Sequence, residues 1–539
     1  MKLFRPVTAV LSLLVAGPAL AQTAPPPKLV VVISVDQFSA DLFAEYRAHF
    51  TGGFTRLMTG AVFPSGYQSH AATETCPGHS TILTGDHPAR TGIVANDWTD
   101  LKIAREDKTV YCAEDESVPG SSSTKYTVSD KHLKVPTLGE WMKLANPASR
   151  VVSVAGKDRA AVMMGGHKTD ELWWWDGKAF VSYAGRAEPA VVTKMNAGVA
   201  ARIAEAQPAL DLPVDCLSHD RAIPVGGGKT VGDGRFARAA GDSRSFRASP
   251  EFDEAILALA AGVATDMKLG KGDATDLLII GASATDYVGH SYGTEGTEMC
   301  LQLLSLDQNL GKLFAVLDKT GVDYAVALTA DHGGHDLPER NRDHAAPTAQ
   351  RAASELGAVQ IGKEIAATLG LTGQLLWGGN FGDVYIDPAL PPAKKAAVLD
   401  AAVKRFAADP QVMGVFTRAQ IEATAAPAGP PETWTIAERI RASYERSRSG
   451  DFYVVLKPRV TPISDPTKGY VATHGSVWDY DRRVPMLFWR KGMIGFEQPL
   501  SVETVDIAPT LAALIHVPVP VAIDGRCLDL DAGPGDSCK

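Results

Sequence analysis

The chain has 539 residues, a formal net charge of −9 and 45% hydrophobic residues. The excess of acids argues against a protein that coats nucleic acids, and we expect no nucleic-acid partner. The hydrophobic fraction is ample for a large core. After the first apolar segment, no stretch has the roughly 20 apolar residues that a membrane span requires, so we expect no span.

The chain begins with the pattern of a secretory signal peptide. Lys2 and Arg5 precede an apolar run over residues 7–15, and residues 19–21 (Ala-Leu-Ala) form a small-x-small cleavage site. We therefore predict that residues 1–21 are removed and that the mature protein is periplasmic or secreted.

Six cysteines in an exported chain favour disulfides, which persist outside the cytoplasm. The cysteines are Cys76, Cys112, Cys216, Cys300, Cys527 and Cys538. They can pair in many ways, and the sequence leaves the connectivity open. A bridge between Cys527 and Cys538 is favoured because it would hold a tail rich in Gly and Asp. None shows zinc-finger spacing, so we expect structural bridges.

The first predicted strand covers residues 28–35 and is apolar on both faces. It ends on Asp36. An acid at the carboxyl end of such a strand lies where open α/β sheets bind ligands. The alternative is a helix N-cap for the next segment, and the strand alone does not decide between them.

Residues 73–81 (TETCPGHST) read as a turn that presents a nucleophile. Pro77 favours the first position of a helix. Thr75 would then lie at or just before the helix N-terminus, where free N–H groups and the positive dipole end attract an anion such as phosphate. Taken alone, such a threonine is more often a turn cap.

The next candidates are polar residues near strand ends. Residues 91–98 form a short strand or loop that contains Asn96, a residue type common in turns. A strand over residues 150–156 runs into Lys157 and Arg159. Alternation along an extended chain would place both cations on one side, where they repel each other unless an anion lies between them. A solvated edge is the alternative.

Two further segments are easier to interpret. Residues 172–180 are typical of a hairpin with an Asp-Gly turn. Residues 226–230 (GGGKT) imitate part of a P-loop, but Ile223 stands where the first glycine is required. We therefore reject a P-loop.

The second half alternates helices and strands. Helices are predicted over residues 252–267, 299–318 and 506–515, and strands over residues 276–281, 324–330 and 484–489. Asp286 and His290 follow one strand, and Asp331 and His332 follow the next. His474 lies beyond a long, proline-rich segment. Carboxylates and imidazoles are ligands of Zn²⁺, so several of them at equivalent strand ends indicate a metal site.

Together these residues resemble the alkaline phosphatase superfamily. Its nearest branches are the threonine-nucleophile monoesterases with a Lys-x-Arg pair and the nucleotide pyrophosphatase/phosphodiesterases. The matching pieces are Asp36, Thr75-x-Pro77-x-His79, Asn96, Lys157-x-Arg159, Asp286-xxx-His290, Asp331-His332-Gly333-Gly334, Thr473-His474-Gly475 and residues 505–511. The resemblance implies an α/β three-layer sandwich with a central, mostly parallel sheet. One catalytic domain would cover residues 22–539, with inserted cap segments at about 97–270 and 340–470.

The resemblance also implies two zinc ions in one active site. One ion would be held by Asp286, His290 and His474, and the other by Asp36, Asp331, His332 and the Thr75 hydroxyl. Thr75 would be the nucleophile and would form a phosphothreonine intermediate. The non-bridging phosphoryl oxygens would be bound by Asn96, Lys157 and Arg159. The remaining histidines, with His79 and His335 nearest the motifs, are expected to be structural or to support the ligands.

These expectations describe an exported alkaline phosphatase acting on small phosphate monoesters, with a monomer favoured. The Lys-x-Arg pair suits a monoester, which offers an unsubstituted, charged oxygen where a diester carries a second organic group. A phosphodiesterase or nucleotide pyrophosphatase on the same metals is the main alternative. A mutase, a phosphonate hydrolase or an inactive phosphate- or metal-binding protein fits less well. A serine hydrolase is disfavoured because the chain lacks a G-x-S-x-G turn.

Overall fold

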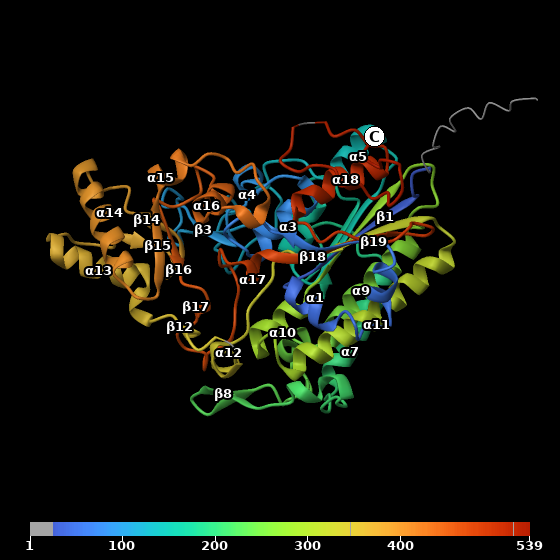
Figure 1. The fold of residues 1–539 in the computed structure, drawn as a ribbon, viewed down its shortest axis with the longest axis horizontal. Helices are drawn as coiled ribbons and strands as arrows, with labels where there is room; N and C mark the ends of the chain where they lie inside the picture. The colour runs from blue at the N-terminus through green and yellow to red at the C-terminus, as the bar shows by residue number, and fades with distance from the viewer. Residues whose placement is uncertain (1–24, 345, 521) are drawn as a thin grey trace, which may run out of the picture.

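The computed structural model describes residues 25–344, 346–520 and 522–539. The predicted signal peptide lies outside the described residues. Within them, ten strands form a central sheet (Figure 1). These strands are β1 (Leu29–Val35), β2 (Ala61–Tyr67), β5 (Val151–Ala155), β6 (Glu171–Trp175), β7 (Phe180–Val181), β10 (Asp276–Ala282), β11 (Tyr324–Thr329), β18 (Arg483–Arg490), β19 (Phe496–Glu497) and β20 (Val502–Glu503).

The strand order is β19-β2-β18-β11-β1-β10-β5-β6-β7, with β20 also beside β2. The five strands from β11 to β6 are parallel, whereas β18 is antiparallel to both of its neighbours and β7 is antiparallel to β6. The mostly parallel sheet predicted from the sequence is therefore confirmed.

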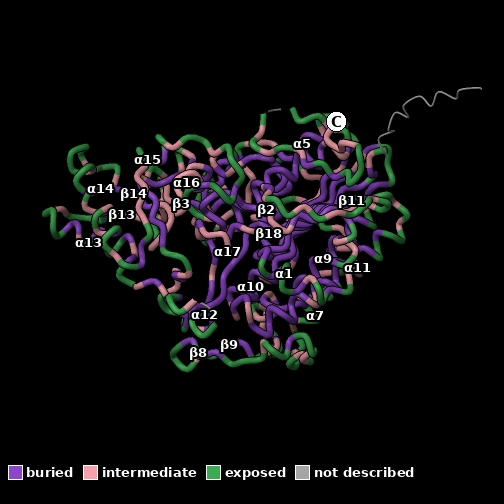
Figure 2. Tube along the Cα trace, in the orientation of Figure 1, coloured by how far each residue is buried: buried purple, intermediate pink, exposed green. Residues whose placement is uncertain are grey.

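The strand β1 shows how the sheet makes two cores. All seven residues are buried. Leu29, Val31 and Ile33 join one hydrophobic cluster, while Val30 and Val32 join the other, because successive side chains point to opposite faces. One face is covered by α1 (Ala40–Tyr46), α7 (Ala190–Ala204), α9 (Pro250–Asp266) and α11 (Thr297–Thr320). The other face is covered by α3 (Thr75–Thr84), α5 (Leu138–Ala145), α6 (Asp158–Gly165) and α18 (Ile507–Leu514). These layers confirm the three-layer sandwich, and Figure 2 shows the burial concentrated along the sheet.

A second, smaller sheet lies at the other end of the molecule (Figure 1). It is built from β13 (Leu376–Trp377), β14 (Gly382–Ile386), β16 (Phe452–Leu456) and β15 (Val412–Thr417). The helices α13 (Ala358–Leu369) and α14 (Pro392–Ala407) pack on it around a core of their own. The exact bounds of the two insertions remain a prediction, since residues 151–181 also supply three strands of the central sheet.

Several local predictions can be compared with the structure. The hairpin at residues 172–180 forms as β6 and β7. Thr75 is the first residue of α3, as expected, although Pro77 is the third residue rather than the first. The expected alternation through Lys157 and Arg159 is wrong, because the strand ends at Ala155. Lys157 is the N-cap of α6, and Arg159 lies inside that helix.

All six cysteines are paired. The bridges are Cys76–Cys112, Cys216–Cys300 and Cys527–Cys538. The favoured bridge in the tail is therefore confirmed, and the structure supplies the two pairings that the sequence left open. No helix in the described part of the chain has the length and apolar character to cross a membrane.

Candidate functional site

Three predicted acids meet at the carboxyl ends of neighbouring parallel strands. Asp36 follows β1 directly, and Asp331 lies just beyond β11. Asp286 lies in α10 (Ala284–Tyr292), which begins soon after β10. Because β1 pairs with both of the other strands, the three ends lie side by side. All three carboxylates are at most 1% exposed.

One group of ligand atoms contains Asp286, His332 and His474, whose atoms lie within 4.8 Å of one another. The Nε2 atoms of His290 and His474 each lie 3.3 Å from Asp286 Oδ1. The rings of His332 and His474 stack with their centroids 3.6 Å apart. The residues expected at the first metal position therefore surround one carboxylate, together with His332.

A second group contains Asp36, His79 and Asp331, again within 4.8 Å. His79 lies 3.3 Å from each carboxylate, through Nε2 to Asp36 Oδ1 and through Nδ1 to Asp331 Oδ2. His332 Nε2 lies 3.2 Å from Asp331 Oδ2, so His332 stands between the two groups. All six predicted carboxylate and imidazole ligands thus come together, and His79 joins them. Its position one helical turn after Thr75 is a signal that could have indicated this.

The acids have the unpaired oxygens expected of metal ligands. Among the described residues, no hydrogen bond of good geometry reaches either carboxylate oxygen of Asp36, Oδ1 of Asp286 or Oδ2 of Asp331, although Lys157 Nζ lies 2.9 Å from Asp36 Oδ2 and histidine nitrogens lie within 3.3 Å of the other oxygens. Three buried carboxylates beside one ammonium group carry an excess of negative charge, which is costly in the interior, and a bound cation would offset it. The donor set of carboxylates and imidazoles fits Zn²⁺.

The histidines are held so that one nitrogen faces the acids. Each ring places Nδ1 2.8 Å from a backbone carbonyl, with the pairs His290–Ala472, His332–Gly333 and His474–Thr73. Because a carbonyl oxygen can only accept, Nδ1 carries the proton, and Nε2 is left as the metal-facing nitrogen. Burial lowers the pKa of His474 to about 4, so this ring is neutral.

Lys157 supplies the positive charge nearest Thr75. Its Nζ lies 3.4 Å from Thr75 Oγ1, 2.5 Å from Asp286 Oδ2 and 2.9 Å from Asp36 Oδ2. Lys157 is only 2% exposed, so the alternative of a solvated edge is wrong. Burial works to lower its pKa, but Asp286 and Asp36 outweigh burial and raise the pKa above the usual value. The ammonium group therefore stays protonated.

Close backbone packing sets the position of α3. A Cβ atom on Gly78 would lie 1.9 Å from the carbonyl oxygen of Asp331, so only glycine lets the helix approach the end of β11. Gln37 has a φ of 63° and donates its N–H to Asp331 Oδ1 at 3.0 Å. This left-handed conformation costs roughly 1 kcal/mol or more for a residue other than glycine, and no sequence pattern predicts it.

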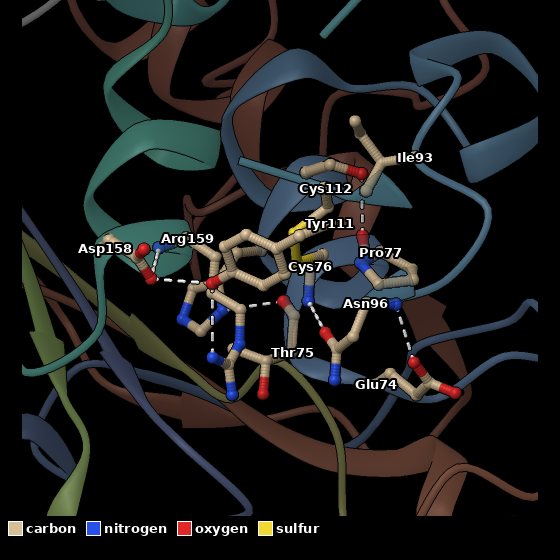
Figure 3. Close-up of a disulfide and its surroundings, with 12 residues drawn as sticks. Glu74, Thr75, Cys76, Pro77, Ile93, Asn96, Tyr111, Cys112, Asp158 and Arg159 are labelled. Carbon is tan, nitrogen blue, oxygen red and sulfur yellow. Dashed lines mark hydrogen bonds between the residues drawn. A yellow bond between two sulfur atoms is a disulfide. The ribbon is translucent and has the colours of Figure 1, made fainter. Parts of the chain in front are cut away.

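Asn96 and Arg159 present donors beside Thr75 (Figure 3). The backbone N–H of Cys76 donates to Asn96 Oδ1 at 2.8 Å, which leaves the amide NH₂ group as the donor. Arg159 donates through Nη1 to the Tyr111 hydroxyl at 3.3 Å, while its buried Nε has no partner among the described residues. Burial opposes the charge of Arg159, but the neighbouring tyrosines and Asp158 hold its pKa well above the usual value.

A cavity of about 350 Å³ adjoins these residues. Its lining includes Glu74 and Ala95, the immediate neighbours of Thr75 and Asn96, and aromatic walls from the smaller sheet, such as Trp377.

Comparisons with known proteins agree with this geometry. Residues 30–477 match the family model described as type I phosphodiesterase/nucleotide pyrophosphatase. The chain is 59% identical over 521 residues to alkaline phosphatase PhoK of a Sphingomonas species, covering 96% of this chain and 93% of that protein.

The fold also matches solved structures. The crystal structure of wild-type alkaline phosphatase PafA superimposes with a TM-score of 0.80 at 26% identity, covering 94% of this chain and 99% of that one. A PafA variant, altered at a threonine, an asparagine, a lysine and an arginine, gives a TM-score of 0.79 at 25% identity, covering 92% and 97%. The chain therefore belongs to the type I phosphodiesterase/nucleotide pyrophosphatase family, within the alkaline phosphatase superfamily that its motifs predict.

Proposed function

We propose that this chain is an exported, zinc-dependent alkaline phosphatase that hydrolyses small phosphate monoesters through a phosphothreonine intermediate, and that it acts as a monomer. The observation that carries the proposal is the place of Thr75. Its hydroxyl lies at the start of α3, beside the Lys157 ammonium group, which also contacts Asp36 and Asp286. The name alkaline phosphatase, carried by PhoK and PafA, supports the same activity.

Two zinc ions would be held by the two predicted ligand sets, which overlap the two observed groups, with His332 lying between them. The first set is Asp286, His290 and His474, and the second is Asp36, Asp331 and His332. When bound, zinc supplies positive charge that favours ionisation of the Thr75 hydroxyl and stabilises charge on the leaving oxygen. His79 touches both acids of the second set and would hold them in place.

Thr75 would lose its hydroxyl proton to solvent and attack the phosphorus atom through Oγ1, and the bond to the ester oxygen would break to release the alcohol, which takes its proton from water. A water molecule would then attack the phosphorus atom of the phosphothreonine, releasing inorganic phosphate and restoring the Thr75 hydroxyl. Lys157 cannot take the proton of Thr75, because its own pKa is raised and it already carries a proton. It instead offers positive charge within 3.4 Å of the attacking oxygen. Such fixed charge is the main contribution that a protein makes to phosphoryl transfer.

Asn96 and Arg159 would bind the non-bridging oxygens. Asn96 offers its amide NH₂ group, and Arg159 offers the donors that Tyr111 does not occupy. A monoester leaves these oxygens free, whereas a diester carries an organic group on one of them. The PafA variant is altered at the same four residue types, in the order in which Thr75, Asn96, Lys157 and Arg159 follow each other here.

A phosphodiesterase remains the second candidate, because the matching family model bears that description. The deciding measurement is kcat/KM for an aryl phosphate monoester and for its diester, on one zinc-loaded sample. We expect a large preference for the monoester that shrinks in Arg159→Ala. A preference for the diester would overturn the role proposed for Arg159.

The nucleophile is tested by Thr75→Ala. We expect this variant to lose nearly all turnover while it keeps two zinc ions, measured by elemental analysis. Acid quenching of the wild type with a ³²P-labelled monoester should leave label on Thr75, located by peptide mapping. Full turnover without Thr75 would refute the assignment.

Export is supported by the pairing of all six cysteines in disulfides, which persist outside the cytoplasm. Mass spectrometry of the protein from the periplasm or the medium should find a mature chain that begins at Gln22. An intact N-terminus would contradict the predicted cleavage.

A further inference from the structure

The bridge between Cys76 and Cys112 lies closer to the proposed chemistry than the other two disulfides do. Cys76 directly follows Thr75, and Cys112 directly follows β4 (Thr109–Tyr111). Both cysteines are fully buried. The bridge thus joins the start of the nucleophile helix to a strand that comes 36 residues later in the chain (Figure 3).

Both halves of this bridge bind Asn96. The N–H of Cys76 donates to the side-chain oxygen of Asn96 at 2.8 Å, and the N–H of Cys112 donates to its backbone oxygen at 2.9 Å. The N–H of Asn96 in turn donates to Glu74 Oε2 at 2.6 Å. These three bonds fix both the backbone and the amide orientation, so that the NH₂ group is the part left for a phosphoryl oxygen.

The same strand also holds Arg159. The Tyr111 hydroxyl accepts from Arg159 Nη1 at 3.3 Å and donates to Asp158 Oδ1 at 2.6 Å. Asp158 also accepts from the Tyr126 hydroxyl at 2.8 Å. Since Tyr111 is bonded to Cys112 in the chain, a shift of this strand would move the contact that orients the guanidinium group.

We propose that the Cys76–Cys112 disulfide and Tyr111 are positioning elements of the active site, which hold Asn96 and Arg159 in register with Thr75. The inference rests on the proposed function, because it assigns these two side chains to the phosphoryl oxygens. The bridge is the covalent link between the nucleophile helix and the segment of Tyr111 and Cys112, which contacts both donors. Without it, the donors would be displaced relative to Thr75, and a displacement of about 1 Å can cost up to about 100-fold in rate.

The first experiment removes the bridge in Cys76→Ala/Cys112→Ala. We expect kcat/KM for an aryl phosphate monoester to fall about 10- to 100-fold and zinc content to stay at two ions. Inhibition by inorganic phosphate should weaken as well. The matched control is Cys216→Ala/Cys300→Ala, which removes a bridge with a longer separation of 84 residues. A disulfide that closes a longer loop stabilises the folded chain more. The control should therefore lower the unfolding temperature at least as much as loss of the Cys76–Cys112 bridge does, while its kcat/KM stays within about twofold of the wild type.

A double-mutant cycle separates positioning from general stability. The Asn96→Ala/Arg159→Ala background lacks both donors. In this background, removing the Cys76–Cys112 bridge should lower kcat/KM by less than about threefold. An equal loss in both backgrounds would overturn the inference, as would an equal loss in the Cys216/Cys300 control. If the wild type showed no Thr75-dependent monoesterase activity, the proposed function itself would fail.

Tyr111→Phe gives a second test that leaves the disulfide intact. It removes the hydroxyl that Arg159 contacts, so we expect kcat/KM to fall severalfold in the wild-type background and to be unchanged in Arg159→Ala. A loss of the same size without Arg159 would show that Tyr111 acts only on stability, and would refute its positioning role.

Discussion

The two halves of the candidate site are complementary in their unused hydrogen-bonding groups. On the sheet side, Asp36, Asp286 and Asp331 present buried carboxylate oxygens that accept no hydrogen bond of good geometry within the described residues. On the other side, Arg159 has a buried N–H for which the described residues supply no acceptor, and the amide oxygen of Asn96 already accepts a hydrogen bond. One half is therefore suited to a cation and the other to an anion.

The comparison also shows how each half is held. The acids stand at the ends of buried parallel strands, whose positions follow from the core of the sheet. The donors come from a loop and the first turn of α6, and side-chain contacts and a disulfide hold them. Lys157 links the halves, since it contacts two of the acids and also Thr75.

The largest expected effect is on the cation side. Removing zinc with a chelator should reduce turnover to background and lower the unfolding temperature, because buried carboxylates lose their counter-charge. Activity and calorimetry on one sample, before and after adding zinc back, test both effects. Full activity of a sample shown to be metal-free would contradict the assignment of one half of the site to a cation.

On the anion side, Arg159→Ala should lower kcat/KM for monoesters by about 10²–10³-fold, the usual loss for one donor to a developing charge. Zinc content should not change, because within the described part of the chain Arg159 makes no hydrogen bond or ion pair with an acid of either metal group. Arg221→Ala, which breaks an exposed ion pair with Asp343, is the control and should leave kcat/KM unaltered. Loss of zinc from Arg159→Ala would show that the halves are not separate.

The packing beneath the cation side is tested by Gly78→Ala. The added methyl group meets the backbone of Asp331, so we expect a loss of about 1–3 kcal/mol in the free energy of unfolding, with weaker zinc binding. Gly198→Ala is the matched control, because Gly198 lies in α7 with open space around its Cβ position. Gly198→Ala should instead raise the free energy of unfolding by about 1 kcal/mol, because alanine favours a helix more than glycine does. Denaturant unfolding measures the free energy of unfolding of both variants. Equal stability of the two would refute the inference that close packing of Gly78 against Asp331 is required.

The smallest expected effect concerns a cluster of one histidine and two acids. In this cluster a proton on His87, rather than a metal ion, supplies the positive charge between the carboxylates. His87 lies 3.0 Å from Glu503 and 3.1 Å from Asp524. Burial works to lower its pKa, but the two acids raise the pKa from 6.5 to about 10. The stabilisation is therefore fully present below pH 6.5 and is lost as the pH rises toward 10. His87→Gln should be less stable than the wild type at pH 6.5, and the difference in unfolding temperature should shrink by pH 10. A constant difference would contradict this.

The sequence predicted the parts of the site that follow regular elements. Asp36 and Asp331 were found because a buried strand places its last residue at the ligand-binding edge of a parallel sheet. The hairpin at residues 172–180 followed from its turn chemistry. The assignment of Thr75, Lys157 and the histidines to one centre came from the resemblance, since their separations in the chain are too long for local rules.

The remaining features depend on contacts that sequence patterns do not contain. His79 contacts both Asp36 and Asp331 only because Gly78 lets α3 reach the end of β11. Arg159 was expected on an extended strand, but the chain turns into α6 after Ala155. The strained backbone at Gln37 and the pairing of Cys76 with Cys112 likewise arise from tertiary packing.

The position of His474 in the chain has a consequence for maturation. A chain exported from its N-terminus delivers Asp36 and Thr75 early, but His474 follows only after the smaller sheet, which has its own core. On the proposed export route, the first metal group would be incomplete until that segment had crossed the membrane and folded. Because metal affinity depends on the complete ligand set, zinc uptake would be among the last steps of maturation, and a chain truncated before His474 would have the nucleophile without a complete site.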